Sequence, residues 1–304
     1  MQSNHRFARS VLTALRHWPQ PALLGGSPKK MAQMTRDPDM NSQNLEMDAM
    51  QILPSQRQGT GTPLVLVHGY LGGSSQWDSQ LPLLRQHFEV VTLDLAGYGM
   101  ANHLTAPSNM ADHARNVLAT LDHLGIKRFH LLGHSMGGMV VQEIVKQAPL
   151  RVLKLVLYAT GPIGCIPGRF ETMERSRERL REDGVQRTAR RISATWLLDN
   201  ESSPAFEALA SLATLASDQA ASAGLSAMEH WDGRENLPRI EQSTLVIWGE
   251  NDRSYSWSQI ELLWRCIPHA SLAVLPRCAH AVHLERYALF CTILVEFLAQ
   301  GEEI

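Results

Sequence analysis

A serine between two glycines, in the segment Gly133-His134-Ser135-Met136-Gly137, constrains the fold of this chain more than any other feature. An apolar, strand-like run precedes the segment at Phe129–Leu132, and an apolar, helix-like run follows it at Met136–Val145. In that context the pattern G-x-S-x-G predicts a sharp strand-to-helix turn with the serine at its corner. The flanking glycines let strand and helix approach without a Cβ clash, so the serine oxygen is expected to stand clear of the sheet. An inert serine in an ordinary glycine-rich turn is the alternative interpretation.

Strand-like and helix-like segments alternate on both sides of this turn. Short apolar runs bounded by turn residues are typical of strands buried on both faces of a parallel sheet. We expect a short strand near Met50–Arg57 and further strands at Thr62–His68, Phe88–Leu95, Lys127–Leu132, Val152–Ala159, Ser243–Trp248 and Ser271–Leu275. Helices are expected at Trp77–Arg85, Asn109–Leu124 (N-cap Ser108, stop Gly125), Trp257–Cys266 and Leu284–Leu298. The alternation predicts an α/β fold with one doubly wound, mostly parallel sheet.

The alternation is interrupted between residues 163 and 239, where we expect helices and no strand. These helices are expected at Phe170–Glu182, Thr188–Leu198, Pro204–Leu215 and Ser217–Trp231. Because the alternation resumes afterwards, both flanks are expected to belong to one sheet. We therefore divide the chain into an N-terminal extension (1–48), a first part of the core (49–162), a helical insertion (163–239) and a second part of the core (240–304).

The N-terminal extension differs in composition from the rest. Residues 1–36 carry six arginine and lysine residues and no acidic residue. Its apolar piece Val11–Leu15 is too short for the core of a signal peptide. We favour a flexible basic tail or a start codon placed upstream of Met40 or Met47 over a transit-like peptide, and expect no role in the chemistry.

Charge and cysteine usage exclude several classes of partner. The formal net charge is −2, which gives no electrostatic reason to expect nucleic acid as a partner. The four cysteines are scattered without a C-x-x-C pair, so we expect reduced thiols and a cytoplasmic location. No apolar run approaches the roughly 18 residues of a membrane span. The partner expected is a small molecule.

A serine hydroxyl becomes a good nucleophile at neutral pH only beside a base, and the base works best when a third group fixes its tautomer. In a doubly wound sheet such groups gather at the carboxyl ends of the strands. We predict His280, on the loop after the last strand, as the base, in preference to His283 at the entry to the final helix. Asp252, on the turn after the preceding strand, is the predicted acid, and Glu250 is its alternative. His280 and His283 have H-x-x-H spacing, but without H-E-x-x-H or a thiolate cluster we expect no metal.

Attack on a carbonyl carbon creates an oxyanion, which needs preplaced hydrogen-bond donors worth roughly 3–4 kcal/mol each. The backbone N–H of Met136, directly after the serine, is the first predicted donor. The second is the backbone N–H of Tyr70, in the loop after the first parallel strand, with Leu71 as the alternative. Both donors are backbone N–H groups, so this prediction assigns no role to the Tyr70 hydroxyl.

Five motifs give the chain a resemblance to the α/β-hydrolase fold superfamily over about residues 50–300. They are His68-Gly69-Tyr70, Asp94-Leu95-Ala96-Gly97-Tyr98-Gly99, Gly133-His134-Ser135-Met136-Gly137-Gly138, Gly249-Glu250-Asn251-Asp252, and His280 with Leu284-Glu285-Arg286. The resemblance implies a triad of Ser135, Asp252 and His280, in the chain order of the family, and a helical cap after the strand that ends near Ala159. It is strongest to small microbial esterases, enol-lactonases and carbon–carbon bond hydrolases. A serine nucleophile argues against haloalkane dehalogenases and epoxide hydrolases, and Met139 argues against the menaquinone-pathway synthases, which resemble this chain but carry arginine there.

The cap is expected to roof Ser135 and to form an apolar pocket. Residues expected to contact substrate are Leu71, Trp196, Met228, Trp231 and His283; the alternative is that the apolar residues of the insertion only attach it to the core. The Arg- and Glu-rich stretch Glu171–Arg191 is interpreted as a solvated helix face.

Three functional hypotheses follow. The first is a cofactor-free serine hydrolase that cleaves a small, largely apolar ester or lactone through an acyl-enzyme. The second is a carbon–carbon bond hydrolase of a vinylogous diketone. The third is a ligand-binding sensor on the same fold.

Overall fold

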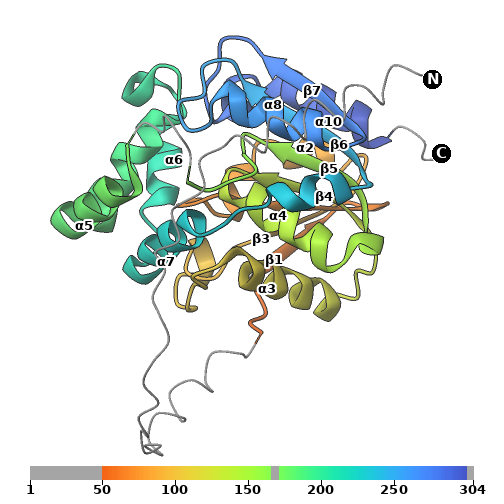
Figure 1. Ribbon diagram of the computed structural model, residues 1–304, viewed down its shortest axis with the longest axis horizontal. Coiled ribbons are helices and arrows are strands. Elements are labelled where there is room, and N and C mark those ends of the chain that lie inside the picture. The colour runs from red at the N-terminus through yellow and green to blue at the C-terminus, as the bar shows by residue number, and fades with distance from the viewer. Residues whose placement is uncertain (1–49, 166–170, 300–304) are drawn as a thin grey trace, which may run out of the picture. The chain divides into compact units, whose positions relative to one another are not determined.

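The computed structural model describes residues 50–165 and 171–299. The predicted N-terminal extension, residues 1–48, lies outside the described residues. A seven-stranded sheet in the order β1-β3-β2-β4-β5-β6-β7 carries helices on both faces (Figure 1). Its strands are β1 (Ser55–Gln58), β2 (Pro63–Val67), β3 (Glu89–Leu93), β4 (Phe129–His134), β5 (Val152–Tyr158), β6 (Ser243–Gly249) and β7 (Ala270–Leu275). Only β1 is antiparallel to its neighbour, so the predicted doubly wound, mostly parallel sheet is confirmed.

The strand order reverses beside β2, which pairs with β3 on one side and β4 on the other. Every residue of β4 is buried, as its apolar sequence predicts for a central parallel strand. In open α/β sheets, binding sites form at the carboxyl ends of the strands next to such a reversal. Val67, the last residue of β2, pairs with Gly133 in β4, so the loop after β2 and the turn after β4 begin side by side.

Two hydrophobic cores attach the helices to the two faces of the sheet. The larger core joins α3 (Met110–His123), α4 (Met136–Gln147) and α8 (Trp257–Cys266) to one face. The smaller core, which includes Trp77 and Phe290, joins α2 (Leu81–Leu84) and α10 (Tyr287–Ala299) to the other. A single turn, α9 (Val282–Glu285), precedes α10. Short 3-10 segments connect these elements: η2 (Ser74–Trp77), η3 (Gly99–Ala101), η4 (Pro149–Arg151), η5 (Asn200–Ser202) and η6 (Arg234–Arg239).

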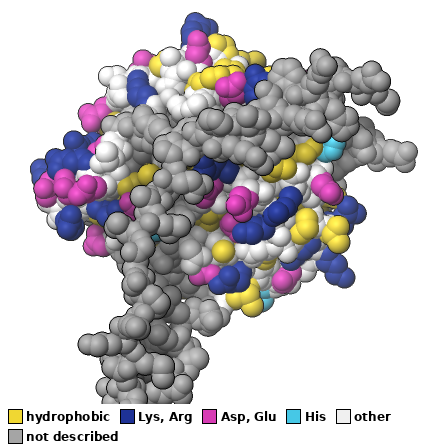
Figure 2. Space-filling model, in the orientation of Figure 1, with side chains coloured by type: hydrophobic (Ala, Val, Ile, Leu, Met, Phe, Trp, Pro, Cys, Tyr) yellow, Lys and Arg dark blue, Asp and Glu magenta, His cyan; other side chains and the backbone are white. Residues whose placement is uncertain are grey.

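The described residues of the insertion between β5 and β6, at the left of Figure 1, form three helices: α5 (Met173–Thr195), α6 (Phe206–Ala213) and α7 (Asp218–Glu229). The first two predicted helices are one element, α5, which Gly184 breaks with a φ of 74°. The two ends of the insertion meet at an antiparallel bridge between Ile163 and Asp232. Positive and negative side chains alternate over α5 (Figure 2), and Arg175 pairs with Glu178 at 2.8 Å, as expected of a solvated face.

Two local predictions were wrong. The single helix expected at Trp77–Arg85 is a 3-10 turn followed by the four-residue α2, whose first turn contains Pro82; proline lacks an N–H and suits that position. The N-cap of α3 is Asn109 rather than Ser108, because the Asn109 side chain accepts a hydrogen bond from the amide of Asp112 at 2.9 Å.

Candidate active site

Ser135 lies at the corner between β4 and α4, in a strained backbone conformation with φ 58° and ψ −122°. Its amide donates to the carbonyl of Tyr158 at 2.9 Å, and its carbonyl accepts from the Thr160 hydroxyl at 2.7 Å. A Cβ at Gly133 would approach the carbonyl oxygen of Gly137 to 2.3 Å, so a side chain there would push strand and helix apart. The serine therefore projects from a corner that its neighbours hold in place.

His280 and Asp252 form a buried pair. The Nδ1–H of His280 donates to Oδ2 of Asp252 at 2.9 Å, and the two side chains are 1% and 0% exposed. The other carboxylate oxygen of Asp252 accepts from the amides of Ser254, at 2.7 Å, and Tyr255, at 3.2 Å. Since a carboxylate only accepts, this arrangement places the imidazole proton on Nδ1 and leaves the Nε2 lone pair of His280 available.

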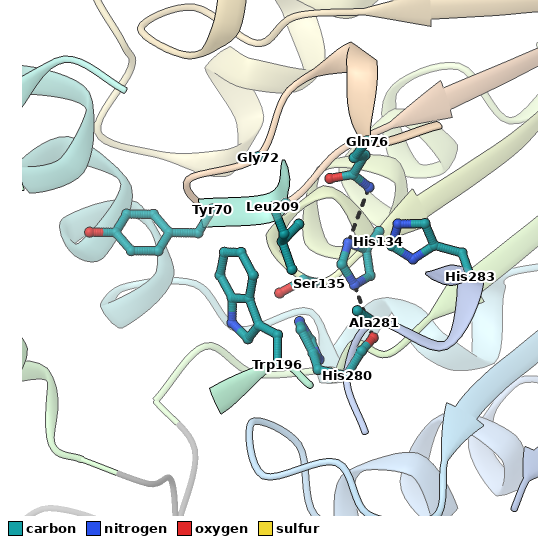
Figure 3. A pocket seen from close by; sticks show the side chains of 11 residues that line it. Tyr70, Gly72, Gln76, His134, Ser135, Trp196, Leu209, His280, Ala281 and His283 are labelled. Carbon is teal, nitrogen blue, oxygen red and sulfur yellow. Dashed lines mark hydrogen bonds between the residues drawn. The ribbon is translucent and has the colours of Figure 1, made fainter. Parts of the chain in front are cut away.

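Ser135 and His280 line the same small pocket (Figure 3). Its cavity volume is about 10 Å³, roughly the space of one water molecule. Trp196, from the end of α5, and Leu209, from α6, close it on the side of the insertion. The remaining lining residues are Gly69, Tyr70, Gly72, Gln76, His134, Ala281 and His283.

The loop after β2 passes directly beside Ser135. A Cβ at Gly69 would come within 2.8 Å of the Ser135 Cβ, so the backbone of this loop touches the serine. Leu71, in this loop, has a positive φ of 56°. Asp94, at the end of β3, accepts from the amide of Ser74 at 2.7 Å and from its hydroxyl at 3.0 Å, which holds the loop against the sheet. Backbone amides in such a loop can face an oxyanion at the serine.

A comparison with family models matches residues 62–287 to the alpha/beta hydrolase fold. The chain belongs to the alpha/beta hydrolase fold family. The resemblance inferred from the five motifs is thus confirmed.

The relatives of this alpha/beta hydrolase are named after different activities. It is 33% identical over 235 residues to the dihydrolipoyllysine-residue acetyltransferase component of the acetoin cleaving system of Pseudomonas putida, a match that covers 74% of this chain and only 60% of that protein. It is 30% identical to a pimeloyl-[acyl-carrier protein] methyl ester esterase of Pectobacterium carotovorum, with 80% and 96% of the two chains covered. A 2-hydroxy-6-oxo-6-phenylhexa-2,4-dienoate hydrolase of Comamonas testosteroni is 26% identical, with 80% and 89% covered. Among solved structures, a hydrolase from Pseudomonas aeruginosa has a TM-score of 0.73 at 29% identity, with 81% and 94% covered.

Two further histidines of this hydrolase support the loop that carries His280. His134 stacks on the Tyr158 ring at 4.4 Å between centroids, and its Nε2 lies 3.4 Å from the His280 carbonyl oxygen. The Tyr158 hydroxyl donates to that same carbonyl at 3.1 Å and lies 2.8 Å from Nδ1 of His283. Burial lowers the pKa of His283 to about 3 and that of His134 well below its ordinary value. Both are therefore neutral at physiological pH.

The predicted substrate contacts fall into two groups. Trp196 and His283 line the pocket, as does Tyr70, whereas Leu71, Met228 and Trp231 are not among its lining residues. The Trp231 indole N–H donates to Glu143 at 3.1 Å, and Leu71 is only 1% exposed. These side chains pack within the protein, so nothing in the pocket lining supports a substrate contact by them.

Several lining residues were not predicted. Gln76 follows the loop after β2 and donates to His134 Nδ1 at 3.3 Å, and Leu209 comes from α6. Leu209 is one of many apolar residues in the insertion, so the helical pattern alone does not distinguish it from residues that only pack. Ala281 was detectable in principle, because it directly follows His280.

In the part of the chain that the structure describes, no three His, Cys, Asp or Glu side chains gather in an arrangement that suits a metal ion. No helix of that part combines the length and the apolar character needed to cross a membrane.

Proposed function

We propose that this alpha/beta hydrolase cleaves a carboxylic ester or lactone by nucleophilic catalysis. Ser135 is the nucleophile, His280 the base and Asp252 the group that orients His280. The observation that carries the proposal is the buried 2.9 Å hydrogen bond from His280 Nδ1 to Asp252, beside a pocket that Ser135 also lines. A buried carboxylate that holds an imidazole with Nε2 free is the arrangement that a serine nucleophile requires.

In the proposed mechanism, Nε2 of His280 takes the hydroxyl proton as Ser135 Oγ bonds to the carbonyl carbon. The Asp252 carboxylate stabilises the imidazolium that forms. Met136 is the first residue of α4, so its amide belongs to the first helical turn, whose N–H groups have no intrahelical partner. This amide and that of Tyr70 are the proposed oxyanion donors. His280 then gives the proton to the leaving alkoxide as the C–O bond breaks, and water attacks the acyl-enzyme by the same route to release the acid.

The pocket lining favours a small, largely apolar substrate. No lysine or arginine occurs among the described residues that line it, so a carboxylate-bearing substrate finds no cationic partner there. Trp196 and Leu209 cover the pocket from the insertion, which supports a role for α5, α6 and α7 as a cap. The four cysteines, all free, fit a cytoplasmic location.

The second candidate is a carbon–carbon bond hydrolase of a vinylogous diketone, because the dienoate hydrolase of Comamonas testosteroni is a relative along most of its length. Such substrates carry a carboxylate, and the lining without a cationic side chain weighs against them. A ligand-binding sensor has less support, since it would not need the buried pair of His280 and Asp252.

Replacement of Ser135 with alanine tests the proposed function. Turnover of p-nitrophenyl acetate and butyrate should fall by on the order of 10⁴-fold or more in Ser135→Ala. A fluorophosphonate probe should label the wild-type protein and not the variant, whereas a sensor with a vestigial site should label poorly. A panel of esters, lactones and dienoates then separates the two hydrolase hypotheses. Wild-type-like ester turnover by Ser135→Ala would exclude Ser135 as the nucleophile.

A further inference from the structure

The turn that carries Asp252 also holds the end of α5. Arg253, the next residue, donates from Nη1 to the carbonyl of Leu197 at 2.9 Å and from Nη2 to the carbonyl of Leu198 at 3.0 Å. Its Nη1 also lies 3.0 Å from the side-chain oxygen of Asn200. The same Nη1 donates to the carbonyl of Thr195 at 3.4 Å; Thr195 is the last residue of α5, where carbonyls lack intrahelical partners and a cation is favourable. Arg253 therefore connects the turn that carries Asp252 to the segment that follows α5.

The loop that carries His280 holds the same segment from a second side. The Glu285 carboxylate accepts from the amide of Leu198 at 2.6 Å with one oxygen and from the amide of Ala279 at 2.7 Å with the other. The amide of Ala281 donates to the carbonyl of Trp196 at 2.9 Å. Glu285 is thus shared between the insertion and the residue that precedes His280.

Trp196 lies in the middle of these contacts. Its ring centroid is 6.0 Å from that of His280, and its side chain lies beside Ser135 in the lining of the pocket (Figure 3). A cavity of only about 10 Å³ is too small for an acyl group, so a substrate must displace lining side chains, of which Trp196 is the largest. The amides of Trp196 and Leu197 bond within the insertion, to the carbonyls of Ser193 and Ala194. The carbonyls of residues 196–198 and the amide of Leu198 bond instead to groups near the acid and the base.

We propose that Arg253 and Glu285 are positioning residues that form an insertion joint with residues 195–200. The joint fixes the position of Trp196 relative to His280 and Asp252. The same contacts therefore determine both the width of the pocket and the geometry of the acid–base pair. This inference rests on the proposed function and deepens it, because it assigns acyl-chain discrimination to contacts outside the pocket. Neither Arg253 nor Glu285 is among the residues that line the pocket.

The test compares Glu285→Gln with the wild-type protein. A glutamine presents an NH₂ group to one of the two backbone amides, so one of the two hydrogen bonds is lost. Amide hydrogen exchange should become faster at Leu198 or Ala279, because the exchange rate reports local opening. The ratio of kcat/KM for p-nitrophenyl octanoate to that for the butyrate should rise by about fivefold or more, because Trp196 is held less firmly and can move aside for a longer acyl chain. For butyrate, kcat should fall by about 10-fold, because small displacements of reacting groups cost up to about 10²-fold.

Controls separate this role from general loss of stability. Glu207→Gln removes an exposed ion pair with Arg190 that lies wholly within the insertion, and should leave the chain-length ratio within about twofold of wild type. Arg253→Gln tests the joint from its other side if Glu285→Gln fails to fold. Because both residues hold one segment, the effects of the two substitutions on the ratio should be less than additive.

Each outcome decides the proposal. Unchanged exchange at Leu198 and Ala279 in Glu285→Gln would exclude the joint. Faster exchange with an unchanged chain-length ratio would exclude the positioning role. A wild-type protein that neither hydrolyses the esters nor reacts with the fluorophosphonate would instead overturn the proposed function, and the positioning role with it, while the exchange data would still report whether the joint exists.

Discussion

Replacement of Asp252 with asparagine tests the proposed mechanism at its most constrained contact. The asparagine side chain keeps the shape of the carboxylate but changes one oxygen into a hydrogen-bond donor. In the wild-type protein one carboxylate oxygen faces His280 Nδ1, and the other faces the amides of Ser254 and Tyr255. All of these neighbours donate, so the NH₂ group of the asparagine must oppose one set or the other.

The contacts determine which orientation the amide takes. With its NH₂ towards Ser254 and Tyr255, two backbone donors would lose their acceptor, at about 1–3 kcal/mol each when buried. The favoured orientation therefore points the NH₂ at His280, whose Nδ1 must then accept. His280 changes tautomer, its proton moves to Nε2, and the base that Ser135 needs is lost. A wrong tautomer at such a site lowers kcat by on the order of 10⁴-fold, which corresponds to about 5 kcal/mol of barrier.

The assay is hydrolysis of p-nitrophenyl butyrate at pH 7, with urea unfolding to show that the variant is folded. Glu250→Gln is the matched control, because Glu250 lies on the same turn but is exposed and accepts only from the amide of Arg277 at 3.0 Å. Its activity should stay within about threefold of wild type. A folded Asp252→Asn protein with less than about a tenfold loss, or a larger loss in Glu250→Gln, would refute the assignment of the acid and the tautomer argument.

Two further predictions concern pocket size and acid stability. Leu209→Ala should raise the octanoate-to-butyrate ratio of kcat/KM by about tenfold, because it enlarges the pocket, whereas Leu215→Ala on the exposed part of the insertion should not. Burial lowers the pKa of His113 to about 4 from the ordinary 6.5, so the unfolded chain binds more protons and stability falls as the pH drops between these values. At pH 5 this loss is about 2 kcal/mol relative to pH 7. Urea unfolding at pH 7 and pH 5 should show that the free energy of unfolding falls by about 2 kcal/mol less in His113→Asn than in the wild-type protein. In His103→Asn, a control at an exposed histidine, the fall should equal that of wild type. Equal falls in both variants would contradict the attribution to His113.

The sequence by itself determined the elements whose signals are local. The strands β2 to β7, the corner at Ser135 and the run of helices in the insertion depend on periodicity and turn residues within short windows. The described residues have all three, and those of the insertion form no strand. Where two local signals competed, prediction failed: Ser108 and Asn109 are both good caps, and only the geometry of the following turn selects Asn109. The order of the five motifs was enough to identify the family.

Only the tertiary structure decided which side chains meet. Asp252 rather than Glu250 bonds to His280, although both follow the same strand. In the insertion, Trp196 and Leu209 reach the pocket while Met228 and Trp231 pack elsewhere, because helix orientation depends on contacts with distant parts of the chain. Arg253 and Glu285 carry no local pattern that predicts a shared partner. Their partners in the insertion lie more than 50 residues away, so these contacts follow from packing between elements, which local periodicity does not encode.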